Sequence, residues 1–250
     1  MTRFPILPLT LASALMLPAL ALPTLVLGQA QPTLPAFKAA DFASPVPNLW
    51  FPLSGGLTWN YFSAGNGRDK PEERVLTRVM GPGPVLLGIP TVAVRDEARE
   101  ETRLVEVAID YYATDNTGNL WYFGEDVTNY EFDDAGAPTG ANHNGTWRAG
   151  TNGALPGILL AAQPVAGGPV FQEYAAQDKA LDFGTVMATG MTLDGPAGPF
   201  TDVVQQFAGS MLESKLRELK YFAKGVGLVR EEEGISETFT NPGRVSDLQR

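Results

Sequence analysis

The chain has no cysteine and only one histidine, His143, among its 250 residues. The lack of cysteine excludes disulfides, thiolate zinc sites, iron–sulfur clusters, covalently attached c-type haem and cysteine nucleophiles. A single histidine excludes zinc sites built on paired histidines, and a Ser-His-Asp triad would have to take its base from a loop rich in Asn and Gly. We therefore expect no cofactor, and we interpret His143 as a surface loop residue.

Motifs of the common enzyme classes are missing as well. The sequence contains no Gly-x-Ser-x-Gly nucleophile elbow and no Ser-x-x-Lys pair. No glycine is followed by lysine, which excludes a phosphate-binding P-loop, and there is no Gly-x-Gly-x-x-Gly fingerprint. These absences favour a protein that is not an enzyme.

Basic residues are the minority among the charged side chains. Eighteen Lys and Arg stand against 28 Asp and Glu, which gives a formal net charge of −10. Such a surface repels phosphate backbones and anionic lipid head groups, so we exclude nucleic acid and basic membrane docking. With 44% hydrophobic residues, the chain can still bury a substantial core.

The first 30 residues have the composition of a secretory leader. Arg3 precedes an apolar run over residues 4–27, and Gly28-Gln29-Ala30 offers small residues to a signal peptidase. The run is long enough to be a membrane anchor instead, but four prolines interrupt it and little basic charge follows. We predict a signal peptide cleaved after Ala30, and hence a periplasmic or secreted protein. Because there is no cysteine for lipid attachment, we expect no stable membrane anchor after cleavage.

The remaining chain divides into two parts by composition. Residues 31–47 are rich in Pro and Ala with little periodicity, and we interpret them as a spacer. Residues 48–250 show no internal repeat and no second composition, so we predict a single β-rich domain.

Short segments with strand character recur through residues 48–250, separated by Gly, Pro, Asn and Asp. Leu104–Ala113 has the clearest period of two, which predicts a dry face of Val, Ile and Tyr and a wetter face with Glu106 and Asp110. Gly81-Pro82-Gly83-Pro84 predicts a turn between two strands, and Asp115-Asn116-Thr117-Gly118 predicts a hairpin turn. The pattern is that of a mostly β, antiparallel protein with little helix.

One segment, Met211–Phe222, does not follow the strand pattern. Its Met and Leu residues recur at helical spacing, and its composition favours helix. Read as a strand, the same residues give only a ragged alternation. Local rules therefore favour a helix here and leave a strand open.

Carboxylates are the remaining candidates for chemistry. Glu125 follows an aromatic strand and Glu173 lies further along the chain, and a glycosidase needs two such groups about 5–9.5 Å apart across a cleft. Acidic neighbours along one strand point to opposite faces, and a solvated acidic edge accounts for these residues without catalysis.

A calcium site is a second, weak candidate for the acidic residues. Its ligands would be Asp115, Asn119, Asp133 and Asp134, which offer hard oxygen atoms in and after one turn. Their spacing does not match an EF-hand loop, and a hairpin turn explains Asp115 and Asn119. We therefore expect no metal.

Aromatic residues concentrate in the N-terminal half. In pairs such as Tyr111-Tyr112 and Trp121-Tyr122, a strand must point one ring to each face. One face holds the core, and the rings on the other face are either covered by a second layer or exposed for binding. The candidate ligand contacts are Trp59, Tyr61, Trp121 and Phe123.

Nine segments of the chain are distinctive when taken together and in order: Asn48–Leu53, Gly56–Trp59, Asp115–Glu125, Gly145–Trp147, Ala149-Gly150, Leu155–Ile158, Gln172–Tyr174, Tyr221–Ala223 and Gly225–Val229. With these segments the chain resembles a family of uncharacterised bacterial secreted proteins and lipoproteins. The resemblance covers roughly residues 48–232, implies no catalytic residues, and departs from the family in lacking the lipid-attachment cysteine. It implies a strand before Tyr221, leading into a turn where Lys224 replaces the usual proline, so we predict strand there. It also implies a loose similarity to lipoprotein carriers of the LolA type, and hence a single curved antiparallel sheet or partial barrel.

Three functions follow from these expectations. The first is an exported, non-enzymatic protein that binds a lipid or other apolar or amphipathic molecule on an aromatic sheet face. The second is a structural or partner-binding envelope protein with no ligand cavity, in which the same rings are buried. The third is a carboxylate-dependent hydrolase using Glu125 or Glu173.

Overall fold

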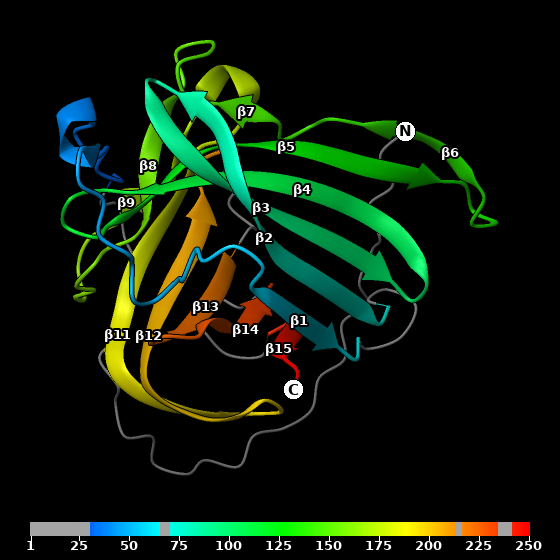
Figure 1. Cartoon of the computed structure of the whole chain (residues 1–250). Coiled ribbons are helices and arrows are strands. Elements are labelled where there is room, and N and C mark those ends of the chain that lie inside the picture. The colour runs from blue at the N-terminus through cyan, green and yellow to red at the C-terminus, as the bar shows by residue number, and fades with distance from the viewer. Residues whose placement is uncertain (1–30, 66–70, 214–216, 235–241) are drawn as a thin grey trace.

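The computed structural model describes residues 31–65, 71–213, 217–234 and 242–250, and it confirms the predicted mostly β fold. The leader predicted for residues 1–30 lies outside the described residues. Figure 1 shows a strongly curved antiparallel sheet in which β1–β5 and β11–β14 form two facing sides. The strands are β1 (Thr58–Ser63), β2 (Glu73–Leu86), β3 (Ile89–Glu100), β4 (Arg103–Thr114), β5 (Leu120–Phe132), β6 (Pro138–Asn142), β7 (Trp147–Arg148), β8 (Leu155–Leu160), β9 (Val170–Phe171), β10 (Glu173–Tyr174), β11 (Asp182–Gly195), β12 (Gly198–Ser210), β13 (Arg217–Ala223), β14 (Gly227–Glu233) and β15 (Arg244–Leu248), with two short 3-10 helices, η1 (Ala39–Phe42) and η2 (Ala176–Asp178).

The sheet is built mainly from hairpins between consecutive strands. Its order is β10-β8-β5-β4-β3-β2-β1-β15-β14-β13-β12-β11-β9, with β6 and β7 also paired to β5. The turn between β2 and β3 consists of Leu87 and Gly88, whose φ values of 50° and 82° suit the tight two-residue hairpin. The turn predicted at Gly81–Pro84 is wrong. Strand β2 continues through it to Leu86 with two register shifts, because bulges tolerate prolines that cannot donate to the ladder.

The two ends of the sheet meet at Gln172, which separates β9 from β10 by a single residue. Its side-chain amide donates to the Leu159 carbonyl (3.1 Å) and to Gln206 Oε1 (2.9 Å), so it joins β8 to β12. Gly157 and Gly184 permit this close approach, since a Cβ at Gly157 would lie 2.2 Å from a backbone oxygen and one at Gly184 would lie 2.5 Å from the Gln172 amide. The sheet is therefore nearly closed, as the predicted partial barrel requires.

Strand β4 shows which face of the sheet is interior. Asp110 and Tyr112 are buried and line the inside of the curve, whereas Ile109 is only half-buried on the outer face. The predicted difference between a dry Val/Ile/Tyr face and a wetter Glu106/Asp110 face does not hold, because Asp110 is buried as deeply as Tyr111 while Ile109 is half-buried. A period of two shows that the faces differ, but it does not show which one the sheet folds around.

The N-terminal segment covers part of the outer face. Phe42 on η1 is buried against Trp121 and Phe123, with ring centroids 5.6 Å apart in both cases, and Phe37 packs on the same two rings. Thr33 forms a parallel bridge with Val170 of β9. Residues 31–47, which the sequence suggested as a spacer, thus lie on the sheet and complete its outer packing.

The segment Met211–Phe222 resolves in favour of strand where the structure describes it. Residues Arg217–Ala223 form β13, which pairs with β12 and β14, as the family resemblance predicted. Met211 and Leu212 are exposed in a bend, and residues 214–216 lie outside the described residues. The helical spacing was misleading because tertiary pairing overrides local propensity.

Candidate functional site

A cavity of about 240 Å³ lies inside the curved sheet, and we call it the interior cavity. Strands from both sides of the sheet contribute to it, so the fold itself creates this space. Its wall combines acidic, aromatic and amide side chains with one lysine. The lining side chains are Phe51, Tyr61, Thr77, Asp96, Asp110, Tyr112, Tyr122, Leu159, Gln172, Glu173, Asp182, Ala208, Glu218, Lys220, Phe222, Leu228 and Glu231, and Gly209 also borders the space.

Strand alternation explains how so many polar groups reach the inside. On β13, Glu218, Lys220 and Phe222 line the cavity, and the intervening Leu219 and Tyr221 are packed into the buried core. Neighbouring strands continue the same row, because Lys220 lies directly opposite Gln206 on β12 and Glu231 on β14.

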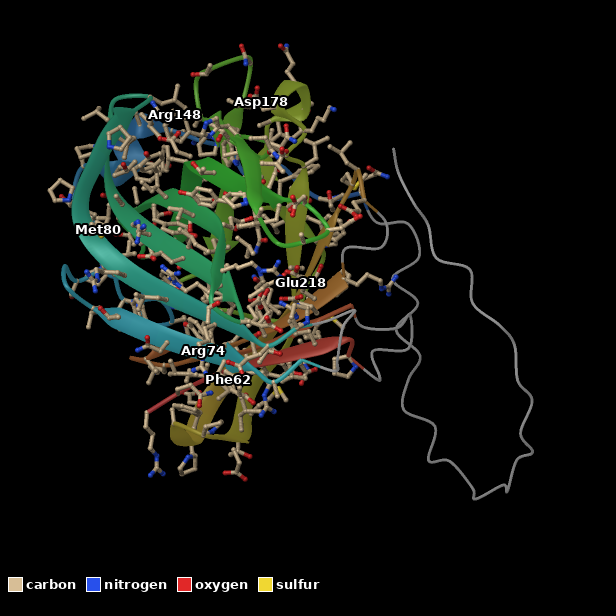
Figure 2. All side chains as sticks on the ribbon, turned by 90° about the vertical axis from the view of Figure 1, so that its right-hand side faces the viewer. Phe62, Arg74, Met80, Arg148, Asp178 and Glu218 are labelled. Atoms are coloured by element: carbon tan, nitrogen blue, oxygen red, sulfur yellow. The ribbon has the colours of Figure 1, made fainter. Side chains whose placement is uncertain are left out.

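Among the described residues that line the interior cavity, the one cationic side chain is Lys220, which forms a cluster with Glu218 and Glu231. Lys220 Nζ lies 3.2 Å from Glu218 Oε2 and 3.3 Å from Glu231 Oε1. The exposed fractions of the side chains are 27% for Lys220, 16% for Glu218 and 23% for Glu231. Protein surrounds all three, and their exposure arises because they border the cavity. Figure 2 shows Glu218 among the side chains that gather beside the orange strand β13.

The charges of this cluster shift the pKa values of all three groups. Burial alone would lower the pKa of Lys220, but the charges of Glu231 and Glu218 outweigh it and hold that pKa well above its usual value. Burial raises the pKa of Glu231 to about 8, against the opposing effect of Lys220. Burial also acts to raise the pKa of Glu218, but Lys220 and a hydrogen bond from Glu231 lower it overall. A hydrogen bond between the two carboxyl groups raises the pKa of Glu231 and lowers that of Glu218, so Glu231 is the donor of the pair and Glu218 the acceptor.

Asp96 and Asp110 form a second pair, on the adjacent strands β3 and β4, and hydrogen-bond to each other. The Tyr122 hydroxyl donates to Asp110 Oδ1 at 2.7 Å. Burial, followed by the charges of Asp96 and Glu125, raises the pKa of Asp110 well above its usual value, and burial also raises the pKa of Asp96. The Oδ1 atom of Asp96 is buried and has no hydrogen-bond partner within the part of the chain that the structure describes.

Glu173 and Asp182 line the cavity next to the closure of the sheet. Burial, followed by the charges of Asp182 and Asp110, raises the pKa of Glu173 well above its usual value. Glu125 lies directly opposite Asp110 across β4 and β5, and burial and the charge of Glu173 raise its pKa as well. The two residues named for a hydrolase thus share one electrostatic environment, and catalysis by them stays a prediction.

Aromatic rings form the apolar part of the wall. Phe51 packs against Tyr112 with centroids 5.5 Å apart and against Phe222 at 6.5 Å. Tyr122 stacks on Tyr112 at 4.9 Å while its hydroxyl reaches Asp110. The cavity therefore places apolar ring faces next to carboxyl groups.

The four aromatic residues predicted as ligand contacts lie on two different faces. Tyr61 lines the interior cavity and donates its hydroxyl to the Leu228 carbonyl at 3.0 Å. Trp59 stacks on the cavity residue Phe51 at 6.0 Å. Trp121 and Phe123 lie on the outer face beneath the N-terminal segment, where a second layer covers them.

The weak calcium candidates do not converge on a metal site. The Asp115 carboxylate already accepts hydrogen bonds from the Thr117 and Asn119 backbone N–H groups, at 2.8 and 3.0 Å, and from Trp121 Nε1 at 2.9 Å. Asp133 accepts two backbone N–H groups in an exposed turn that also contains Asp134. No group of three His, Cys, Asp or Glu side chains has the arrangement to hold a metal within residues 31–65, 71–213, 217–234 and 242–250. The predicted hairpin turn at Asp115–Gly118 is confirmed.

Replacing Asp115 by alanine should lower the free energy of unfolding by about 2–4 kcal/mol, because buried donors around it lose their acceptor. Urea unfolding at pH 7 measures the loss. Asp133→Ala is the matched control, and since water can replace its carboxylate in the exposed turn, it should cost less than about 1 kcal/mol. Equal losses for the two variants would contradict this role of Asp115.

Sequence reasoning missed most of the interior carboxyl groups and Lys220. The available signal was the charge at every second position of Glu218-Leu219-Lys220, alternating with core residues. Alternation of this kind is normally assigned to a solvated face, and only the closure of the sheet turns that face inward.

A second depression, which we call the outer groove, lies between the N-terminal segment and the β2–β3 hairpin. Its volume is about 390 Å³, and its lining is largely proline and aliphatic, including Pro45, Pro47, Ile89 and Pro90. Val85 pairs with Pro90 across the hairpin and is 65% exposed.

The fold and the site together define a nearly closed antiparallel sheet around a carboxyl-lined cavity. No family model matches the chain, and no curated protein is similar to it in sequence. Two solved structures match with low similarity. A Bacteroides fragilis protein, provisionally described as exported with a YmcC-like fold, is 14% identical with a TM-score of 0.41, covering 81% of this chain and 98% of its own. A Parabacteroides distasonis protein, provisionally described as a lipoprotein, is 13% identical with a TM-score of 0.43, covering 82% of this chain and 99% of its own.

Neither similarity is high enough to transfer an activity, and the loose similarity to lipoprotein carriers is not confirmed. In the described part of the chain, none of the helices has the length and apolar character needed to cross a membrane.

Proposed function

We propose that the protein is a non-enzymatic, extracytoplasmic binding protein that holds a small amphipathic molecule in its interior cavity. The observation that carries this proposal is the cavity itself, where the Phe51, Tyr112 and Phe222 rings adjoin the carboxyl groups of Asp96 and Asp110. Extracytoplasmic location follows from the predicted leader at residues 1–30 and from the family resemblance.

The size of the cavity sets the size of the ligand. Its volume of about 240 Å³ equals that of about eight liquid waters and lies just below the usual range for drug-sized ligands. Polar groups that converge on an apolar pocket fix the orientation of a bound molecule. The ligand class is therefore a small molecule with an apolar body and hydrogen-bonding groups at one end.

Partner binding is the second candidate function, and the outer groove favours it. The groove is apolar, and exposed Val85 and Met80 lie on the strand beside it. Binding there would leave the interior cavity unoccupied, so the two functions make different predictions for a variant that fills the cavity.

Replacing Leu159 by tryptophan should abolish ligand retention, because Leu159 lines the cavity and the larger ring would occupy it. The measurement is native mass spectrometry of protein purified from its own envelope fraction, before and after organic extraction. Wild type should carry a discrete extra mass that extraction removes, and the variant should not.

Leu155→Trp is the matched control, since Leu155 lies on the same strand but is 38% exposed and does not line the cavity. It should retain the extra mass. A ligand that persists in Leu159→Trp would place binding elsewhere, and a bare wild-type mass would favour partner binding.

A further inference from the structure

The described residues of the interior cavity include more carboxyl groups than their one cation, Lys220, can neutralise. Lys220 is engaged by Glu218 and Glu231. The other four carboxyl groups of the lining make no ion pair with a described residue, and they are Asp96, Asp110, Glu173 and Asp182. Buried charges in proteins are normally paired, so this part of the wall either keeps its protons or receives a positive charge from outside the chain.

The Asp96–Asp110 pair leaves one buried acceptor unsatisfied at that place, although the Asp96 side chain also hydrogen-bonds to Thr77 and Asp110. Asp110 is held by the Tyr122 hydroxyl, but the buried Oδ1 of Asp96 has no partner among the described residues. An orphaned buried acceptor costs free energy that a ligand N–H donor would recover. An ammonium group would neutralise the carboxyl groups and would also donate to the unsatisfied acceptor, because it has donors and a positive charge and no acceptor.

Apolar rings lie within reach of the same cavity. Phe51, Tyr112 and Phe222 line the cavity and offer apolar surface to a hydrocarbon body, and aromatic rings also attract cations. The charge of Lys220 acts on Asp96, Glu173 and Asp182 and partly offsets the rise of their pKa values, but Lys220 forms its ion pairs with Glu218 and Glu231. A bare metal ion is a poorer match, since the described residues provide no metal-holding cluster.

We propose that the ligand of the interior cavity is an organic amine, whose ammonium group binds at Asp96 and Asp110 and whose apolar body lies on Phe51, Tyr112 and Phe222. This inference rests on the proposed function and specifies its ligand class. Burial raises the pKa values of Asp96 and Asp110, so binding of the ammonium should displace a proton from this pair to solvent. Amine uptake is thus an exchange of a proton for an organic cation.

The test compares three six-carbon probes by isothermal titration calorimetry at pH 7: hexylammonium, hexan-1-ol and hexanoate. The full mature protein is first extracted with organic solvent and refolded, and circular dichroism confirms that it has refolded. Hexylammonium should bind at least tenfold more tightly than hexan-1-ol, and hexanoate should not bind. Repeating the titration in phosphate and in Tris should show release of about one proton for each bound amine, because the two buffers have different ionisation enthalpies.

Asp96→Asn should reduce hexylammonium affinity at least tenfold and abolish proton release, with a smaller loss of hexan-1-ol affinity. Asp126→Asn is the matched control, because Asp126 lies on β5 with its carboxylate held by Arg148 and Tyr111 away from the cavity lining. It should bind all probes like wild type. Should Asp96→Asn fail to fold, Asp110→Asn is the replacement.

Equal binding of the amine and the alcohol, both lost in Leu159→Trp, would overturn the amine inference and leave the proposed function standing. Tighter binding of hexanoate would also overturn it. Failure of all three probes would overturn the inference, and a bare mass for wild type in the native spectra would then remove the proposed function as well.

Discussion

Replacing Lys220 by methionine should lower the free energy of unfolding by about 3–5 kcal/mol at pH 8. Lys220 lies 3.2 Å from Glu218 and 3.3 Å from Glu231, and methionine fills similar space without the charge. The buried Glu218 carboxylate would lose the cation that lowers its pKa. At pH 8 the folded protein must then keep an uncompensated charge or take up a proton against the solution pH, and either costs stability.

Two further variants separate this charge effect from lost packing. Lys224→Met removes a lysine whose partner Asp202 lies 3.5 Å away with both side chains about half exposed, so it should cost less than about 1 kcal/mol. Combining Lys220→Met with Glu218→Gln should restore most of the stability, because the uncompensated charge is gone. Urea unfolding at pH 5.5 and 8 completes the test, since the loss should be smaller at pH 5.5. A loss that is the same at both pH values and persists in the double variant would identify a packing effect.

The stability of the whole protein should fall as the pH rises from about 5 to about 8.5. Glu231 has an ordinary pKa of 4.5 and a native pKa of about 8, so between these values the unfolded chain releases a proton that the folded chain keeps. A native state that binds more protons loses stability as pH rises, by about 1.4 kcal/mol for each unit of pKa difference. The raised pKa values of Asp110 and Glu173 act in the same direction.

Carboxyl groups with lowered pKa values do not oppose this trend. The contribution of Glu218 has the opposite sign, but it is complete above the ordinary carboxyl pKa and is lost only in more acidic solution. Thermal unfolding should therefore show a melting temperature about 5–10 °C lower at pH 8.5 than at pH 5.5, given about 2–4 °C for each kcal/mol in a chain of this size.

Glu231→Gln tests whether Glu231 causes the fall of stability with rising pH. Glutamine resembles the protonated acid and can still donate to Glu218, so the variant should match wild type at pH 5.5 and exceed its stability at pH 8.5. Glu232→Gln is the matched control, because Glu232 accepts the Tyr221 hydroxyl at 3.2 Å and does not line the cavity. It should keep the wild-type slope. A wild-type stability that is level or rising over this range would show that the interior carboxyl groups are solvated.

Much of the fold could be predicted from the sequence because strands and turns are encoded locally. The period of two in Leu104–Ala113 and the Asp115–Gly118 turn both predicted elements that the structure contains. The proline-rich Gly81–Pro84 misled, since a bulged strand and a turn share the same residue types. For Arg217–Ala223, the resemblance gave the strand that local propensity did not.

The site could be predicted only in part. Tyr61 was named as a contact and lines the cavity, but Trp121 and Phe123 face the other side of the sheet. Glu173 was named for a different chemistry. The lysine cluster was missed because the joining of β8 to β12 through Gln172, which closes the sheet, is a long-range event that local patterns do not contain.

The closure at residues 170–174 also bears on how the protein behaves at high concentration. Strands with free backbone N–H and C=O groups at a sheet edge can pair with other copies and start aggregation. Here β9 and β10 cover the outermost long strands, each is only two residues long, and Thr33 further occupies β9. Such short edges are poor templates for a neighbouring chain. The segment that nearly closes the sheet therefore also limits the pairing of strands between molecules, by which aggregates grow. This matters for a cysteine-free protein, which has no disulfides to secure its folded state.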